Sequence, residues 1–282
     1  LMYRLARVVA AELGVPLVVT VWDPPESVGL NARLDGRRQR RAVRDFDETL
    51  RAARRAAVIS ETMAETYGRV YGVETVIVRH GLDATLFQSP PPRCAERTLT
   101  IGFCGSLYAL DEWRALLRAL HTANWTIAGR AVRVRVLSGG IDLRGGEPAC
   151  IEWLGWRPVH ETVRCLAECD VNYLPYWFAP ERRTAVRLCF PTKLSTYLAT
   201  GRPVLFHGPA DASVPRFFAR YPAGYCVDTL APEGIVDALT RTATDEPAYT
   251  RAVAAVAAAR REELSMETFH ARFGQFIGSA PA

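Results

Sequence analysis

Apolar runs of strand length alternate with helical patterns along most of the chain. Residues 1–13 place apolar side chains at helical spacing, and Val15–Val21 is an apolar run typical of a strand buried on both faces. Alternating strands and helices specify parallel sheets covered by helices on both faces, so the predicted class is α/β. Further strands are predicted at 57–59, 76–78, 99–103, 132–137, 151–153, 171–174, 204–206 and 225–227, and further helices at 42–55, 111–120, 161–168 and 192–200, followed by Ala-rich helices.

A proline-rich stretch divides this alternation. Ser89-Pro90-Pro91-Pro92 predicts a stiff linker, so we expect one α/β domain over 1–90 and a second over 91–246, with C-terminal helices over 247–282. The sequence begins at Leu1, inside a helical pattern. We therefore expect the natural N-terminus to lie upstream and the N-terminal domain to be incomplete.

Composition excludes several classes of protein. The 282 residues are 49% hydrophobic and 23% charged, as in an ordinary globular protein, and the net charge of +5 does not indicate nucleic-acid binding. No apolar run is long enough to span a bilayer, and no secretory signal is visible. Seven cysteines without paired spacing predict a reducing, cytoplasmic compartment, and no metal site is expected.

One segment carries the sharpest chemical signal. The 35 Lys and Arg residues include a single lysine, Lys193, within a predicted helix that starts near Pro191 and ends at Gly201. A cation in the first turn of a helix opposes the helix dipole, which makes sense if an anion such as a diphosphate docks there. The alternative is a surface lysine at a tolerated helix end.

Weaker candidates surround this segment. Gly105 and Ser106 lie between a strand and a helix, where backbone amides can face a phosphate, although such a turn can also be only a tight connection. Trp156 and Tyr176 are aromatics that could stack on a base or line a sugar pocket, or simply pack in the core.

A run of arginines follows the first strand. Arg37, Arg38, Arg40 and Arg41 belong to a stretch that could attract anionic lipid or a lipid-diphosphate acceptor. A solvated helix face is the equal alternative. Aromatic residues are not interleaved with these arginines, so nucleic acid is not expected as a partner.

The segment from Phe190 to Val204 resembles the donor-site helix of family 4 glycosyltransferases, which have the GT-B fold. The resemblance extends over most of the chain. Segments 58–61 and 80–87 resemble the end of that family's N-terminal domain, and 102–107 resembles the loop that opens its C-terminal domain. Segments 151–156 and 169–176 resemble the parts near the base and the sugar. Arg157 lies where the family approaches the base.

The resemblance implies two Rossmann-like domains of the GT-B type, the first on the acceptor side and the second binding the nucleotide sugar, with the C-terminal helices packing back toward the first. It implies transfer of a sugar from a nucleotide diphosphate sugar to a hydroxyl or lipid-linked acceptor, as in polysaccharide or glycoconjugate synthesis. The transfer would retain anomeric configuration and use neither metal nor cofactor. Expected donor-binding residues are Gly105, Ser106, Trp156, Arg157, Tyr176, Lys193 and Thr196.

Three positions depart from the family pattern. Many members have two glutamates where this chain has Leu188 and Thr196, and an arginine where it has Ser106. These departures keep two alternatives open, a non-catalytic partner that binds a nucleotide sugar and another GT-B enzyme such as a nucleotide-sugar epimerase. No catalytic residue can be assigned from the sequence. The sequence also leaves open whether the protein, expected in the cytoplasm, contacts the inner face of a membrane.

Overall fold

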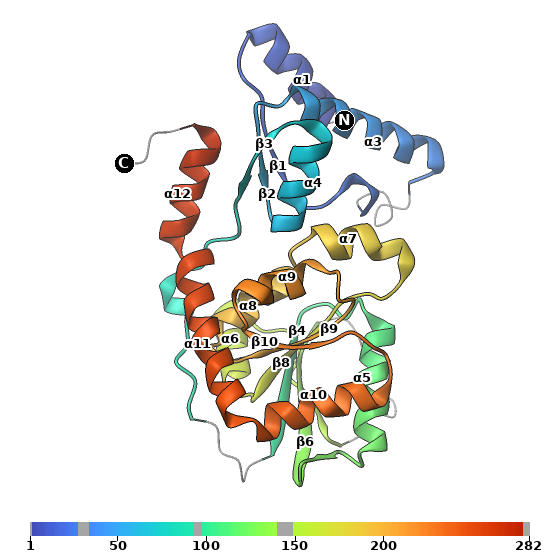
Figure 1. Ribbon diagram of the computed structural model, residues 1–282, viewed down its shortest axis with the longest axis vertical. Helices are drawn as coiled ribbons and strands as arrows, with labels where there is room; N and C mark the ends of the chain where they lie inside the picture. Colours follow the sequence, from blue (N-terminus) through green and yellow to red (C-terminus); the bar gives the residue numbers. More distant parts are fainter. Residues whose placement is uncertain (1, 28–33, 93–97, 140–148, 279–282) are drawn as a thin grey trace. The chain divides into compact units, whose positions relative to one another are not determined.

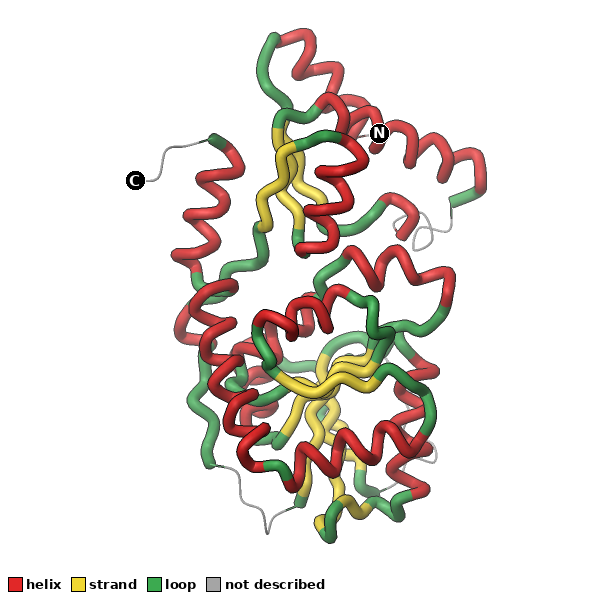
Figure 2. Tube along the Cα trace, viewed as in Figure 1, coloured by secondary structure: helices red, strands yellow, loops and turns green. Residues whose placement is uncertain are grey.

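The computed structural model describes residues 2–27, 34–92, 98–139 and 149–278, and Figure 1 shows their helices and strands. The chain forms two compact units. The first contains residues 1–81, 179–190 and 266–282, and the second contains 82–178 and 191–265. Within the described residues each unit has its own sheet, one of three strands and one of seven, which can be followed in yellow in Figure 2. The two separate sheets of mainly parallel strands confirm the predicted α/β class.

The first unit is built on three parallel strands in the order β1-β2-β3. Helix α1 packs on α3, α4 packs on β3, and α12 packs on β2 and β3 although it comes from the far end of the chain. Phe276 of α12 completes a small core there with Ala57 and Val76. The elements are α1 (Met2–Leu13), β1 (Val18–Val21), α3 (Gly36–Ala52), β2 (Arg55–Val58), α4 (Glu61–Tyr71), β3 (Glu74–Ile77), α7 (Arg183–Leu188) and α12 (Met266–Ile277).

Local capping explains where two of these helices begin. The Asp35 carboxylate accepts the amides of Arg37 and Arg38 at 3.0 and 2.9 Å, so α3 starts earlier than its apolar pattern suggested. These backbone bonds lower the pKa of Asp35. Ser60 caps α4 by accepting the amide of Met63 at 3.1 Å.

Strand β1 differs from its prediction. The run Val15–Val21 was expected to be buried on both faces, but exposed and buried residues alternate along β1, and Val18 is 37% exposed. The strand therefore has one exposed face, and it lies at the edge of the sheet, paired only with β2 among the described strands. Apolar side chains of α1 are exposed as well, including Leu5, Val9 and Leu13.

The second unit is built on a sheet in the order β10-β9-β8-β4-β6-β5, with β7 also paired to β6. All of these pairings are parallel except the short β5–β6 pair. The elements are β4 (Leu99–Cys104), α5 (Leu110–Thr122), β5 (Thr126–Ile127), β6 (Arg130–Leu137), β7 (Ile151–Trp153), α6 (Val159–Ala167), β8 (Val171–Pro175), α8 (Thr192–Ala199), β9 (Val204–His207), α9 (Ser213–Arg220), β10 (Gly224–Val227), α10 (Pro232–Thr244) and α11 (Glu246–Glu263).

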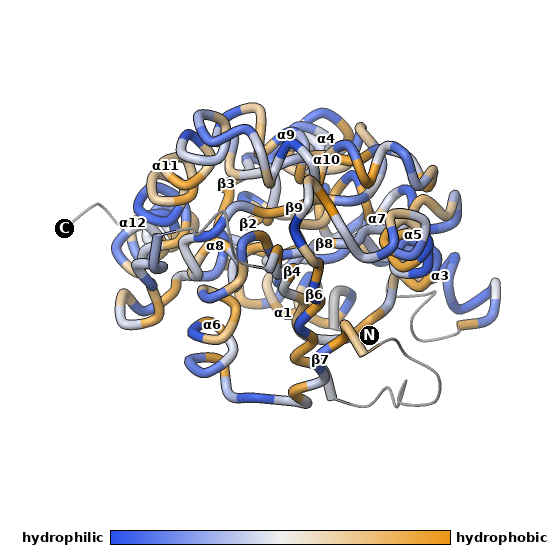
Figure 3. Tube along the Cα trace, turned by 90° about the horizontal axis from the view of Figure 1, so that it is seen from below, coloured by the Kyte–Doolittle hydropathy of each residue, from blue (hydrophilic) through white to orange (hydrophobic). Residues whose placement is uncertain are grey.

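Helices cover this sheet on both faces. Trp113 and Leu116 of α5, together with Ile235 of α10, bury the side chains of β4, β6 and β8 in one continuous core. Helices α6 and α8 contact β4, β8 and β9, and α11 packs on α8. The alternation of hydrophobic and hydrophilic residues along β6 can be followed in Figure 3, and it matches the alternating burial of that strand. The central strands are apolar because both of their faces are covered.

The proline-rich stretch packs within the second unit. Arg202 donates to the Pro91 carbonyl at 2.8 Å. Gly201 has a φ of +77° and lies against Pro90, because a Cβ on Gly201 would stand 2.6 Å from the Pro90 ring. The boundary between the units accordingly falls at Gly81, upstream of the predicted linker. The predicted C-terminal segment also divides, since α11 belongs to the second unit and α12 to the first.

Candidate functional site

The carboxyl end of β4 leads into an exposed turn. Gly105 has a φ of +77°, a conformation that favours glycine, and its amide donates to the Leu137 carbonyl at 2.9 Å. The amide of Cys104 donates to the hydroxyl of Tyr197, on α8, at 3.1 Å. Gly105 and Ser106 are both exposed, so the turn presents its backbone at the edge of a parallel sheet where α/β proteins bind ligands.

Helix α8 brings Lys193 to this turn. Within the described residues no side chain caps α8, whose first residue follows Pro191. A Cβ on Gly105 would stand 3.3 Å from Cε of Lys193, and the Lys193 ammonium lies 3.9 Å from the centre of the Tyr108 ring. Burial lowers the pKa of Lys193 to about 8. The structure therefore joins two of the sequence-predicted residues, Gly105 and Lys193, into one cluster with Ser106 beside it.

Thr196 lies one turn beyond Lys193 on α8 and is half-buried. Its neighbour Ser195 is buried, and the Ser195 hydroxyl has no hydrogen-bond partner among the described residues. Leu188, the other position where many family members have a glutamate, is a buried residue of α7 in the first unit. A hydroxyl at Thr196 can accept or donate a hydrogen bond, but it carries no charge.

Trp156 and Arg157 follow β7 at the same edge of the sheet. Trp156 is 71% exposed, and a Cβ on Gly139, after β6, would stand 3.2 Å from Cβ of Trp156. Arg157 is exposed and donates to the Trp156 carbonyl at 3.0 Å. Its guanidinium lies 3.9 Å from Glu161, an exposed ion pair of little energetic weight. The indole of Trp156 is thus available to a flat ligand such as a base.

Tyr176 occupies a different environment from the one predicted for a donor contact. Its side chain is 3% exposed, stacks on Trp177 with ring centres 5.6 Å apart, and meets Phe206 edge-on. Core packing, the alternative reading of this aromatic, accounts for these contacts. A direct contact between Tyr176 and a donor stays a prediction.

The second unit contains a buried polar network that was not predicted from the sequence. The Tyr173 hydroxyl lies 2.7 Å from Nδ1 of His207, and Nε2 of His207 lies 2.8 Å from the Thr229 carbonyl oxygen. Since a carbonyl only accepts, Nε2 carries the imidazole proton. Burial lowers the pKa of His207 to about 4. A polar residue that ends a buried apolar strand, as His207 ends Val204–Phe206, was the available signal.

Glu112 and Tyr108 were also missed. Glu112, in the first turn of α5, is 3% exposed, and one of its carboxylate oxygens accepts the Phe178 amide at 2.7 Å. Burial raises the pKa of Glu112. Tyr108 contacts Trp177, whose ring centre is 4.5 Å away. No sequence pattern relates residues 108 and 177, because only the folded sheet brings them together.

The predicted arginine surface lies on α3, in the first unit. Arg37, Arg38, Arg40 and Arg41 are all exposed. Arg38 forms an exposed ion pair with Asp35 at 3.4 Å. Arg40 and Arg44 line an open depression of about 490 Å³ together with Gly36, Gln39, Val43 and Asp47.

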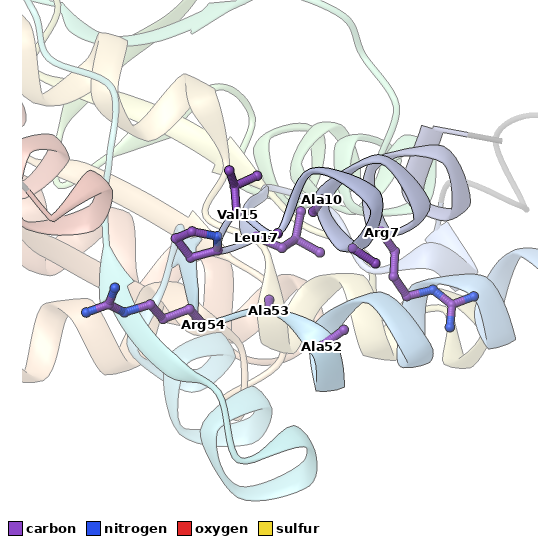
Figure 4. Close-up of a pocket in the computed structure, with 10 residues that line it drawn as sticks. Arg7, Ala10, Val15, Leu17, Ala52, Ala53 and Arg54 are labelled. Atoms are coloured by element: carbon purple, nitrogen blue, oxygen red, sulfur yellow. The ribbon is translucent and has the colours of Figure 1, made fainter.

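A second cavity in the first unit lies between α1 and the end of α3. Figure 4 shows its lining, which includes Ala10, Leu17 and Ala53, with Arg7 and Arg54 as the charged side chains. Its volume is about 360 Å³. The Arg7 guanidinium is paired with Glu48 at 2.6 Å. The cavity contains none of the sequence-predicted site residues.

Within the described residues, no helix has the length and apolarity needed to cross a bilayer. The same residues contain no cluster of three or more His, Cys, Asp or Glu side chains placed to hold a metal ion.

Comparison with known proteins gives matches in structure only. No protein-family model and no curated protein matches the sequence. Among solved structures, HepE of Anabaena, solved with UDP and glucose, superposes with a TM-score of 0.70 at 14% identity over 99% of this chain and 75% of HepE. Sucrose-phosphate synthase of Thermosynechococcus elongatus gives 0.67 at 15% identity over 98% and 71% of the two chains.

WaaG, a glycosyltransferase involved in lipopolysaccharide biosynthesis, gives a TM-score of 0.58 at 15% identity over 95% of this chain and 76% of WaaG. At such identities the likeness concerns the fold. These matches confirm that the chain has the predicted GT-B fold of two Rossmann-like domains, which it shares with glycosyltransferases.

Proposed function

We propose that this protein transfers a sugar from a nucleoside diphosphate sugar to a hydroxyl acceptor and binds the donor diphosphate between the Gly105 turn and Lys193. The observation that carries the proposal is the contact between the only lysine in the chain and an exposed glycine turn at the carboxyl edge of the second unit's sheet. HepE, which shares the fold, was solved with UDP-glucose.

The proposed site has to stabilise negative charge. When the bond between the sugar and the diphosphate breaks, negative charge accumulates on the departing diphosphate. The Lys193 ammonium and the backbone amides of Thr192 and Lys193, at the start of α8 where no side chain caps the helix, are donors suited to that charge. Ser106 and Thr196 add hydroxyls, and Trp156 and Arg157 are the proposed contacts of the base. No residue is assigned as a nucleophile or general base.

The direct test is calorimetric titration of UDP and GDP. Lys193→Ala should weaken binding by about tenfold to a hundredfold, since charge-assisted hydrogen bonds contribute roughly 1.5–3 kcal/mol each and 1.4 kcal/mol is a factor of ten. The matched control is Arg118→Ala, which removes a positive charge from an exposed side chain of α5 outside the proposed site and should have the smaller effect. Equal affinity of wild type and Lys193→Ala would place the donor elsewhere.

We further propose retention of anomeric configuration and catalysis without a metal, as the resemblance to family 4 implies. In this scheme Lys193 supplies the positive charge that a bound metal would otherwise supply. The anomeric coupling constant of the product, measured by NMR before mutarotation, tests the first point. Activity that persists in excess EDTA tests the second.

A non-catalytic role in binding a nucleotide sugar is the second candidate. It is favoured by the absence of a carboxylate at both Leu188 and Thr196. Transfer or hydrolysis of sugar from a radiolabelled donor decides between the two. Thr196→Glu, which restores the family's residue, should raise turnover in a transferase and leave a non-catalytic binder inactive.

We also propose that the arginine surface of α3 makes peripheral contact with the inner face of the membrane, from the cytoplasm, and that the acceptor is lipid-linked. Arg37, Arg40 and Arg41 are exposed, and no carboxylate forms an ion pair with them among the described residues. A cluster of unpaired guanidinium groups attracts anionic headgroups. The exposed apolar residues of α1, which packs on α3, add surface that a headgroup region can bury.

A further inference from the structure

The Lys193 ammonium rests on an aromatic face. Its nitrogen lies 3.9 Å from the centre of the Tyr108 ring and 5.8 Å from that of Phe103. The charge of an ammonium is attracted by the negative face of an aromatic ring. No carboxylate forms an ion pair with Lys193 among the described residues, so the Tyr108 ring is the group that holds its charged end.

Trp177 in turn holds Tyr108. The two ring centres are 4.5 Å apart, and Nε1 of Trp177 donates to the Tyr108 carbonyl at 3.1 Å. The adjacent Phe178 amide donates to the buried Glu112 carboxylate at 2.7 Å. The segment after β8 is therefore tied to the start of α5, and through it Tyr108 is fixed in both backbone and ring.

We propose that Tyr108 and Trp177 are positioning residues that hold the Lys193 ammonium beside the Gly105 turn, ready for the phosphate of a nucleoside diphosphate. The identity of that ligand rests on the proposed function, whereas the placement of the ammonium does not. An aromatic face suits this task better than a carboxylate, because it orients the cation without neutralising it. A paired carboxylate would compete with the incoming anion.

The single lysine makes the proposal directly measurable. Protein grown with lysine labelled with ¹³C at Cε gives one side-chain signal, that of Lys193. The ring current of Tyr108 should shift the attached protons upfield from their position in free lysine. Tyr108→Leu should remove most of this shift, and Tyr108→Phe, which keeps the aromatic face, should preserve it. Trp177→Leu should remove part of this shift, and Trp177→Phe should remove a smaller part of it.

A UDP titration of the same variants gives the second readout. Tyr108→Leu should weaken binding about twofold to thirtyfold, from the ordinary range of cation–π energies, and Tyr108→Phe should bind nearly as wild type. A lysine signal that is the same in wild type and Tyr108→Leu overturns the proposal. If Tyr108→Leu does not fold, an unchanged signal in Trp177→Leu overturns it instead. A shifted signal in a protein that binds no nucleotide supports the positioning pair and refutes the proposed function.

Discussion

Gly105 and Lys193 meet so closely that a single methyl group on Gly105 would stand 3.3 Å from Cε of the lysine. The contact joins the turn after β4 to the first turn of α8, two elements far apart in the sequence. The ammonium nitrogen of the same lysine lies 3.9 Å from the centre of the Tyr108 ring and 5.8 Å from that of Phe103. The geometry of the proposed donor site therefore depends on a glycine as well as on the charge.

This dependence predicts the effect of Gly105→Ala. The φ of +77° alone should cost about 1–2 kcal/mol of folding stability once a Cβ is present, and the new methyl should displace Lys193. Gly129 is the matched control, because its φ is also +77° and a Cβ there would meet nothing within 4 Å. Both variants should lower the melting temperature, and only Gly105→Ala should weaken UDP binding, about threefold to tenfold by the loss of roughly one hydrogen bond. Equal UDP affinity in the two variants would contradict the site.

The sequence allowed the fold to be predicted because each signal acted locally. The apolar runs located β4, β6 and β8, and Gly201 ended the segment of α8. Val15–Val21 was misread because an apolar run does not say whether both faces of the strand will be covered. The α3 start was placed too late because its cap, Asp35, precedes a run of arginines rather than apolar residues.

The site was less predictable for a physical reason. Lys193 was found because its charge opposes the helix dipole and because no other lysine exists in the chain. Tyr108 and Trp177 carry no such local conflict. Their contacts arise only when the carboxyl ends of parallel strands come together at one edge. A single sequence contains no record of which loops will meet there.

The lowered pKa of Lys193 predicts how nucleotide affinity varies with pH. The free protein begins to lose the ammonium proton as pH rises through about 8, whereas an anion binds the charged form. Between pH 7 and 9 affinity for UDP should fall, by at most about tenfold per pH unit for one linked proton.

Lys193→Arg is the control for that profile, because a guanidinium keeps its charge throughout this range. The affinity of Lys193→Arg for UDP should be lower than that of the wild type at pH 7, and it should change less between pH 7 and 9. Titration of the uracil base affects both proteins equally and cancels in the ratio of their affinities. A ratio that does not change with pH would show that the lysine proton is not linked to binding.

The arginine surface of α3 predicts binding to vesicles that contain anionic lipid. Sedimentation with such vesicles should decrease steeply with salt, since each exposed arginine contributes roughly 1 kcal/mol of screened attraction. Replacing Arg37, Arg38, Arg40 and Arg41 with glutamine should abolish most of it. The control replaces four exposed arginines of the second unit, Arg114, Arg118, Arg133 and Arg164, with the same change of net charge. Equal losses in the two variants would mean that only net charge matters.

The neutral, buried His207 predicts a loss of stability in acid. The pKa of His207 is lowered to about 4 by burial, while an unfolded histidine has a value near 6.5. Between these values the unfolded state takes up a proton that the folded state does not, so stability is full above pH 6.5 and falls as pH decreases. From pH 7 to 4.5 the loss of folding stability should reach roughly 2 kcal/mol by linkage.

His207→Gln, which cannot titrate, is the control. It should be less stable than the wild type at pH 7 because it loses the hydrogen bonds to Tyr173 and Thr229. Its stability should nevertheless decline less over the same range, as urea unfolding at each pH would measure. Parallel pH profiles of the two proteins would show that other groups, and not His207, set the response to acid.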